Sequence, residues 1–166
     1  KTVLQVEVQG WADKYHSNKS NSYIAFINLM IFIKEFRSVF YYRCGYFTKR
    51  LLGWYMPGTV NLFILGEIAP PFFIIHGHST YIHAQRIEEG CQIWHNVTVG
   101  KKQQGKDQLQ PIVGKNVKIS AGAIVLGDIT IGDNSTIGAG SVVIKDVPAN
   151  CVVAGNPAKI ISQLNQ

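Results

Sequence analysis

The sequence predicts a mainly β protein, a left-handed parallel β-helix preceded by an α-helical N-terminal segment. The β-helix rests on two observations. Between Ile75 and Val143, an aliphatic or aromatic residue returns every six positions, with one interruption. A small or β-branched residue follows four positions after most of these residues. From Val113 to Pro148 the repeat continues without a skipped aliphatic.

A period of six fits neither a helix, with its period of about 3.6, nor an ordinary strand, with its period of about 2. It is typical of a chain that turns a corner every six residues and stacks three-sided coils. Gly, Asn and Asp collect where the corners are expected, as in Gly132-Asp133-Asn134, because tight turns need their backbone freedom. Antiparallel hairpins, the alternative, would alternate in polarity and turn at irregular spacing. The predicted inward residues are Ile75, Tyr81, Ile87, Ile93, Val99, Val113, Ile119, Val125, Ile131, Ile137 and Val143.

Helical spacing of apolar residues precedes the repeat. It runs from Ser22 to about Leu52, and Gly45 and Gly53 mark weak points or ends. Residues 1–20 fit either a strand or a helix start. We therefore expect a helical N-terminal segment over residues 1–66.

The β-helix is expected over residues 67–154. A polar loop, residues 100–110, interrupts the repeat and is predicted to leave the coil at a corner. Loops held on a rigid scaffold often carry function. Residues 155–166 form a C-terminal tail, whose last seven residues are expected to fray or to form a short helix.

The charge pattern argues against a nucleic-acid partner. The net charge is +6, but only 16% of residues are charged, so no arginine-rich arm is indicated. The first 66 residues carry eight Lys or Arg against three Asp or Glu, and aromatic residues are dense between Phe40 and Tyr55. These aromatic residues predict a core or a subunit contact, with peripheral membrane contact as the alternative.

The cysteines predict the compartment. Cys44, Cys91 and Cys151 are far apart and have no metal-ligand spacing, which is typical of reduced thiols in the cytoplasm. No signal peptide is visible, and the longest apolar run, which ends at Ile33, is too short to cross a bilayer. We expect a cytoplasmic location, with the inner face of the membrane as the alternative.

Four histidines lie in or beside the first predicted coils, and lysines lie in the nearby loop. A histidine is suited to proton transfer because its pKa is near neutral. A base beside a cationic loop would suit group transfer from a donor that carries phosphate. The residues are His76, His78, His83 and His95, with Lys101, Lys102 and Lys106.

Three stretches resemble the serine acetyltransferase branch of the hexapeptide acyltransferases. They are His76-Gly77-His78-Ser79-Thr80, the run from Cys91 to Gly100, and the ending Ala154-Gly155-Asn156-Pro157-Ala158-Lys159. The resemblance implies a homotrimer with active sites between subunits. It also implies direct transfer of acetyl from acetyl-CoA to a hydroxyl, with no metal.

The resemblance also implies roles for individual residues. His76 would be the general base, and a backbone N–H near Gly100 would stabilise the oxyanion. The pantetheine arm would lie along small residues, and lysines would meet the CoA phosphates. The implied CoA-binding residues are Gly100, Ala121, Gly122, Ala139, Lys145 and Lys159, and the implied acceptor-binding residues are His78, His95 and Gln110.

The chain departs from the serine enzymes where serine would bind. Ile75 stands where the family has an aspartate before the histidine, and Leu109-Gln110 replaces an Arg-His pair. An acidic residue expected in the preceding helices is not evident between Ser17 and Asn28. These departures favour another hydroxyl acceptor, a sugar of a surface polysaccharide, with L-serine as the alternative.

Two hypotheses from other functional classes stay open. Four histidines could supply three ligands across a subunit contact, as in a metal-dependent hydratase of the carbonic anhydrase type. The chain could also be a non-catalytic assembly module that keeps the repeat.

Overall fold

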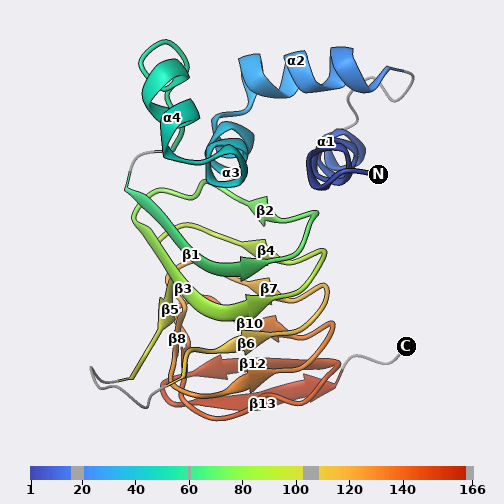
Figure 1. The fold of residues 1–166 in the computed structure, drawn as a ribbon. Coiled ribbons are helices and arrows are strands. Elements are labelled where there is room, and N and C mark those ends of the chain that lie inside the picture. Colours follow the sequence, from blue (N-terminus) through green and yellow to red (C-terminus); the bar gives the residue numbers. More distant parts are fainter. Residues whose placement is uncertain (16–20, 60, 103–108, 164–166) are drawn as a thin grey trace.

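The computed structural model describes residues 1–15, 21–59, 61–102 and 109–163. Within these residues, four helices gather at one end of a β-solenoid (Figure 1). The helices are α1 (Val3–Lys14), α2 (Ser22–Phe32), α3 (Lys34–Cys44) and α4 (Tyr46–Leu52). The predicted fold class, a parallel β-helix after a helical segment, is confirmed.

Local residue chemistry explains where the helices begin and end. Thr2 accepts from the Gln5 N–H in a capping box at the start of α1, so the open choice for residues 1–20 resolves to a helix for the described part. The Asn21 side chain accepts from the first N–H groups of α2. Gly45, with φ of 85°, ends α3. No described helix is long and apolar enough to cross a membrane.

The solenoid strands form two hydrogen-bonded sets. The first set is β1 (Leu62–Ile68), β3 (Thr80–Ile87), β5 (Thr98–Gly100), β6 (Ile112–Val113), β8 (Ile124–Leu126), β9 (Thr130–Ile131) and β11 (Val142–Val143). The second set is β2 (Phe73–Ile74), β4 (Gln92–Ile93), β7 (Lys118–Ile119), β10 (Thr136–Ile137), β12 (Cys151–Gly155) and β13 (Ala158–Gln163). The boundary expected between the helical segment and the β-helix, at residues 66 and 67, falls inside β1. This strand pairs in parallel with β3 from Leu62 onward.

The core consists of stacked aliphatic residues inside the coils. One column joins Ile74, Ile93, Ile119, Ile137 and Val153 through parallel pairing, and all five are buried. From Ile87 onward, every residue predicted to point inward is buried. The six-residue rule holds there because each side of the prism accepts one branched side chain per coil.

The first coil departs from the predicted register. Ile75 and Tyr81 were expected inside, but Ile74 and Ile82 are buried instead, and Tyr81 is 43% exposed. The cause is local: Ile74 pairs with Ile93 and Ile82 with Val99, so the first coil has two more residues at this corner than the second, and His76 adopts φ of 53° there.

Asparagines mark one corner of successive coils. Asn116, Asn134 and Asn150 have φ between 54° and 57°, which Asn tolerates better than most residues. Their side-chain amides form a ladder, with N–O distances of 3.1 Å at both steps. The predicted role of Asn at the corners is therefore confirmed.

The C-terminal end differs from the expectation of a frayed or helical tail. Residues Ala158–Gln163 form β13, which pairs antiparallel with β12. Gly155 has φ of 104° and lies in the turn between the two strands. This antiparallel strand terminates the parallel stack.

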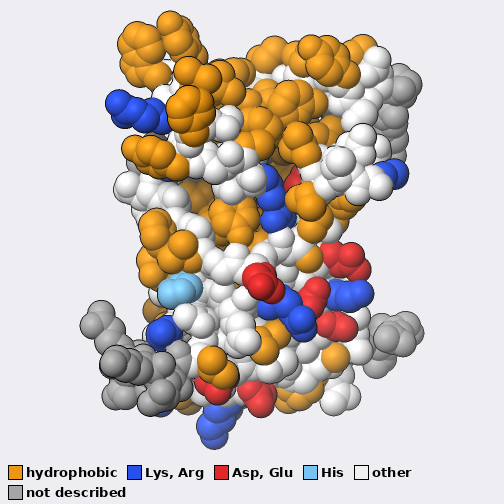
Figure 2. Space-filling model, in the orientation of Figure 1, with side chains coloured by type: hydrophobic (Ala, Val, Ile, Leu, Met, Phe, Trp, Pro, Cys, Tyr) orange, Lys and Arg blue, Asp and Glu red, His pale blue; other side chains and the backbone are white. Residues whose placement is uncertain are grey.

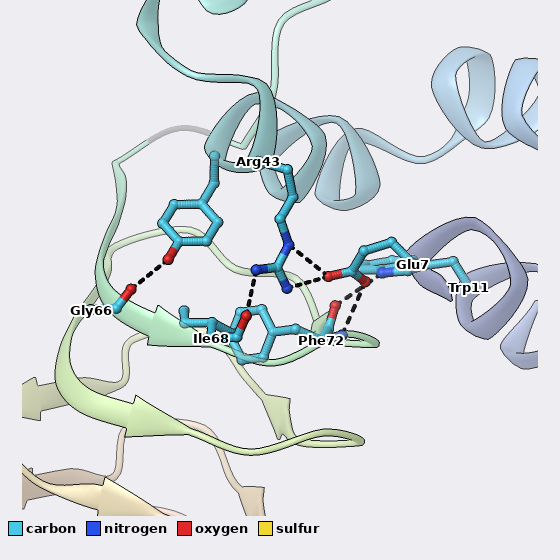
Figure 3. Close-up of polar contacts among 7 residues, drawn as sticks. Glu7, Trp11, Arg43, Gly66, Ile68 and Phe72 are labelled. Atoms are coloured by element: carbon cyan, nitrogen blue, oxygen red, sulfur yellow. Dashed lines mark hydrogen bonds and ion pairs between the residues drawn. The ribbon is translucent and has the colours of Figure 1, made fainter. Parts of the chain in front are cut away.

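A buried ion pair joins the helices to the first coil (Figure 3). The Arg43 guanidinium on α3 donates to Glu7 of α1 at 3.0 and 2.5 Å, and to the Ile68 carbonyl at 2.5 Å. The other Glu7 oxygen accepts from the Phe72 N–H at 3.0 Å, and the Trp11 indole donates to the Phe72 carbonyl at 2.9 Å. Burial raises the pKa of the Glu7 carboxyl, although these donors oppose that effect.

Candidate active site

One corner of the solenoid brings together most of the residues predicted to bind or react. The Asn96 N–H donates to the His78 carbonyl at 3.1 Å, and the Gly122 N–H donates to the His95 carbonyl at 3.0 Å. The Gly140 N–H donates to the Ala121 carbonyl at 2.9 Å. These bonds place His78, His95, Ala121 and Ala139 one above another on successive coils, and we call these four residues the corner column.

The same backbone geometry recurs at each level of the corner column. The residue after each member has a positive φ: 53° at Ser79, 55° at Asn96, 70° at Gly122 and 65° at Gly140. Only Gly and a few polar residues adopt this conformation readily. The corner pattern of the sequence therefore determines which residues share this edge.

Three histidines meet at the upper part of the corner column. The His78 and His95 rings are stacked, with centroids 4.9 Å apart and planes 22° apart. The His76 centroid lies 6.4 Å from that of His95. His76 is exposed, and its carbonyl accepts from the His78 N–H at 2.6 Å in a tight turn. The predicted base and two predicted acceptor-binding residues therefore lie together.

The His76 ring has no orienting partner within the part of the chain that the structure describes. Within the described residues, no side chain or carbonyl forms a hydrogen bond with this ring. The His95 Nδ1 atom is buried and likewise has no hydrogen-bond partner in the described part of the chain. Hydrogen bonds from the described residues therefore do not fix the orientation of the His76 ring.

Below the histidines the edge is open and lined by small side chains. A Cβ added at Gly140 would meet nothing within 4 Å, and one at Gly122 would meet only the Gly140 backbone, at 3.8 and 3.9 Å. Ala121 and Ala139 contribute only methyl groups. An extended ligand arm can therefore lie along this edge in close contact with the backbone, which fits the pantetheine arm of CoA.

The two predicted phosphate-binding lysines lie at different places. Lys159 on β13 pairs with Ala154. The corner column would continue at the next residue, Gly155, so Lys159 lies near the lower end of the column. Lys145 follows β11, which stacks on β8 and β5, and so lies toward the next corner. Gly100, at the end of β5, lies toward that second corner as well.

Gln110 contacts a residue outside the corner column. Its amide nitrogen is 3.2 Å from Nε2 of His83 on β3. The His83 ring packs edge-on against Tyr81, which stacks on Phe63 of β1 at 5.2 Å. This outer group (Phe63, Tyr81, His83 and Gln110) was not predicted from the sequence, since Tyr81 was expected inside. The central residues of the predicted loop, 103–108, lie outside the described residues.

Metal ligation has no ready ligand set in the described part of one chain. Among the described residues, no group of three or more His, Cys, Asp or Glu side chains is placed to hold a metal ion. The thiol of Cys91 donates to the Gly114 carbonyl at 2.9 Å, and burial raises its pKa to about 12. This thiol is a packed core group.

Comparison with known proteins agrees with this geometry. A family model described as bacterial transferase hexapeptide (six repeats) matches residues 110–145. A serine acetyltransferase of Buchnera aphidicola is 34% identical over 152 residues, which cover 84% of this chain and 56% of the relative. A serine acetyltransferase of Synechococcus elongatus is 43% identical over 90 residues, which cover 54% of this chain and 37% of the relative.

A solved structure resembles nearly the whole chain. The serine acetyltransferase of Brucella abortus strain S19, in complex with coenzyme A, has a TM-score of 0.69 and 27% identity, and the match covers 98% of this chain and 68% of that one. In repeat, sequence and fold, the chain is similar to the serine acetyltransferase branch of the hexapeptide-repeat acyltransferases. The chain spans about half the length of the relatives it matches in sequence, such as 56% of the Buchnera protein.

Proposed function

We propose that this chain is an acetyl-CoA-dependent O-acetyltransferase whose acceptor is L-serine. The observation that carries the proposal is the position of His76 beside an open edge of small residues, in a chain similar to serine acetyltransferases. A sugar acceptor was the first expectation from the sequence. The comparisons lend it no support and favour the alternative, L-serine.

The residues of the corner column suggest how the reaction proceeds. Bound acetyl-CoA would supply an acetyl group activated as a thioester, with its arm along Ala121, Gly122 and Ala139. His76 removes the acceptor hydroxyl proton as the oxygen bonds to the acetyl carbon, and then returns that proton to the sulfur as the C–S bond breaks. His78 and His95, whose rings stack next to His76, would border the acceptor. Lys159, near the lower end of the corner column, would meet the phosphates beyond the end of the arm.

We also propose that the protein works as a homotrimer of parallel solenoids. Within one chain, Gln110 contacts His83, which lies outside the corner column. A cyclic arrangement would place the outer group of one subunit against the corner column of the next. Sedimentation velocity on the purified chain tests this, and a monomer at active concentrations would contradict it.

The proposed reaction is tested by following thiol release from acetyl-CoA. L-serine is expected to stimulate release in the native protein, and His76→Ala is expected to lower the rate at least about a hundredfold, because general-base catalysis typically contributes that much. Gln85→Ala, an exposed residue on β3, is the control and should keep the native rate. Equal rates in native protein and His76→Ala would refute the assignment of the base.

The acceptor is tested separately. Leu109-Gln110 stands where the resemblance places the Arg-His pair that holds the amino-acid carboxylate, so serine is expected to saturate the enzyme only at high concentration. The assay therefore compares L-serine with free sugars over a wide concentration range. Acetylation of a sugar but not of serine would overturn the serine proposal and restore the first expectation.

A further inference from the structure

An exposed apolar surface covers the end of the molecule formed by α2, α4 and the turn after α4. Figure 2 shows hydrophobic side chains gathered at this end. Phe32, Phe47, Trp54 and Tyr55 are 76%, 77%, 83% and 79% exposed. We call this region the end surface. Its members are Tyr23, Ile24, Ile27, Ile31, Phe32, Tyr46, Phe47, Leu51, Trp54 and Tyr55.

Helix α2 is apolar on both of its faces. Ala25, Leu29 and Met30 are buried against the rest of the protein, while Ile27 and Ile31 are exposed on the outer face. Its eleven residues include no charged side chain. A helix that is hydrophobic all round is normally covered on all sides, so the outer face of α2 is suited to contact with another apolar phase.

The exposed charged side chains on the same part of the chain are all positive. Between Asn21 and Thr59 the exposed charged side chains are Lys34, Lys49 and Arg50, and the only carboxylate, Glu35, is buried. A two-fold contact between two copies would place the same surface on both sides, with cations and no exposed carboxylate to pair them. The complementary partner is apolar and carries negative charge.

We propose that the end surface binds the surface of an anionic phospholipid membrane. Helices α2 and α4 would lie in the interface, with aliphatic side chains directed toward the acyl chains and Lys49 and Arg50 at the lipid phosphates. Trp54 and Tyr55 suit the headgroup boundary, because their rings combine an apolar body with a polar atom. The described helices are too short to cross, so the binding is peripheral.

A groove beside α4 also favours lipid as the occupant. Its volume is about 700 Å³, and it lies between α3, α4 and β1. Leu62, Leu65 and Tyr46 contribute apolar lining, and Lys49 lies at the same groove. An acyl chain under an anionic headgroup matches this combination of an apolar hollow and a cation.

The position of the end surface relates it to the candidate active site. Helix α3, which joins α2 to α4, packs against β2, and His76 follows β2 by two residues. Figure 1 shows the helices at the end of the solenoid where β1 and β2 begin the stack. Membrane binding would therefore hold the first coil, with its histidines, close to the bilayer surface.

The proposal is tested by co-sedimentation of the purified full chain with lipid vesicles, in the absence of acetyl-CoA. One set of vesicles is pure phosphatidylcholine, and the other contains phosphatidylglycerol as well. The chain is expected to sediment with the phosphatidylglycerol vesicles and to be released as the salt concentration rises. Because the readout is binding without reaction, its failure would leave the proposed transferase activity untouched.

Two pairs of variants separate the apolar and electrostatic contributions. Trp54→Ala with Tyr55→Ala, and Lys49→Glu with Arg50→Glu, should each weaken vesicle binding at least about tenfold. The controls lie on the solenoid: Ile160→Ala with Ile161→Ala on β13, where both are exposed, and Lys118→Glu on β7. These controls should bind as the native protein does. All variants alter exposed side chains, and their circular dichroism and acetyl-transfer rate with a soluble acceptor should match the native protein.

Three outcomes would overturn the proposal. The first is absence of binding to either vesicle. The second is equal binding to both vesicle types without salt dependence, because the cationic side chains would then have no role. The third is self-association that Trp54→Ala with Tyr55→Ala abolishes in sedimentation velocity, without vesicle binding, which would make a second copy the occupant of the end surface.

Discussion

Replacing Arg43 by Met tests whether the buried ion pair holds the helices on the solenoid. The substitution removes both hydrogen bonds from the guanidinium to Glu7 and the one to the Ile68 carbonyl. The Glu7 side chain, only 1% exposed, then keeps the Phe72 N–H as its backbone partner but loses its cation. Removing one member of a buried pair typically costs about 3–5 kcal/mol.

The expected loss for Arg43→Met is therefore about 3–5 kcal/mol in the free energy of unfolding at pH 7.5. Glu7→Gln keeps the shape of the side chain and an acceptor oxygen, so it should cost less, about 1–3 kcal/mol. Urea unfolding followed by tryptophan fluorescence measures both losses at a fixed protein concentration. Trp11, which is buried beside Glu7, is one of the reporters.

The stability lost in Arg43→Met should also depend on pH. Burial raises the pKa of the Glu7 carboxyl in the folded protein above its ordinary value of 4.5, and Arg43 opposes that rise. Without Arg43 the folded pKa rises further, so the folded variant holds a proton that the unfolded chain has lost. Stability of Arg43→Met should accordingly increase as the pH falls from above that folded pKa toward 4.5, because the buried group becomes neutral.

A matched control is available on the solenoid surface. Arg86 pairs with Glu88 at 2.8 Å, but its side chain is 56% exposed. Arg86→Met should cost at most about 1 kcal/mol, as exposed ion pairs do. If Arg43→Met and Arg86→Met lose the same stability at pH 7.5, the buried pair does not join the two parts of the molecule.

Three further predictions concern the core and the corners. At pH 8 a thiol reagent should label the exposed Cys44 and leave Cys91 unlabelled until the protein unfolds. The reason is that burial raises the Cys91 pKa to about 12. Mass spectrometry of the labelled peptides measures which cysteine has reacted. Ile119→Ala should lower the free energy of unfolding in urea by about 2–5 kcal/mol. Ile124→Ala, on the half-buried outer side of β8, should lower it less. Equal losses would contradict the placement of Ile119 in the buried aliphatic column. Asn134→Ala should cost about 1–2 kcal/mol in the same assay, because it loses two amide hydrogen bonds at φ of 57°, and a neutral effect would argue against the ladder.

The fold was predictable because its core follows one rule. Each side of the prism takes one branched aliphatic per six residues, and this rule locates the inward residues from Ile87 onward. The first coil broke the rule because it has two extra residues between Ile74 and Ile82, where His76, which is not a glycine, adopts positive φ. Backbone reversals at such residues leave little signal in a sequence, so the burial of Ile74 and Ile82 could not be foreseen.

The candidate site was predictable only in part. His76, His78 and His95 meet because the coil repeat brings the same corner back at each level. The contact between Gln110 and His83 depends on how the loop returns to the coil, and the repeat carries no information about that. The pairing of Glu7 with Arg43 joins residues 36 positions apart on different helices and has no sequence signature. The roles of Gly100 and Lys145 and the cytoplasmic location stay predictions.

The two ends of the solenoid determine how long it can become. A coil whose last strand is uncovered offers free N–H and C=O groups to the next copy, and such edges promote growth into fibres. Here α3 packs on β2 at one end, and β13 reverses direction against β12 at the other. The helices and the reversed strand thereby change what each end of the stack offers to another copy, and a shortened form that begins after the helices should self-associate more strongly than the chain with its helices.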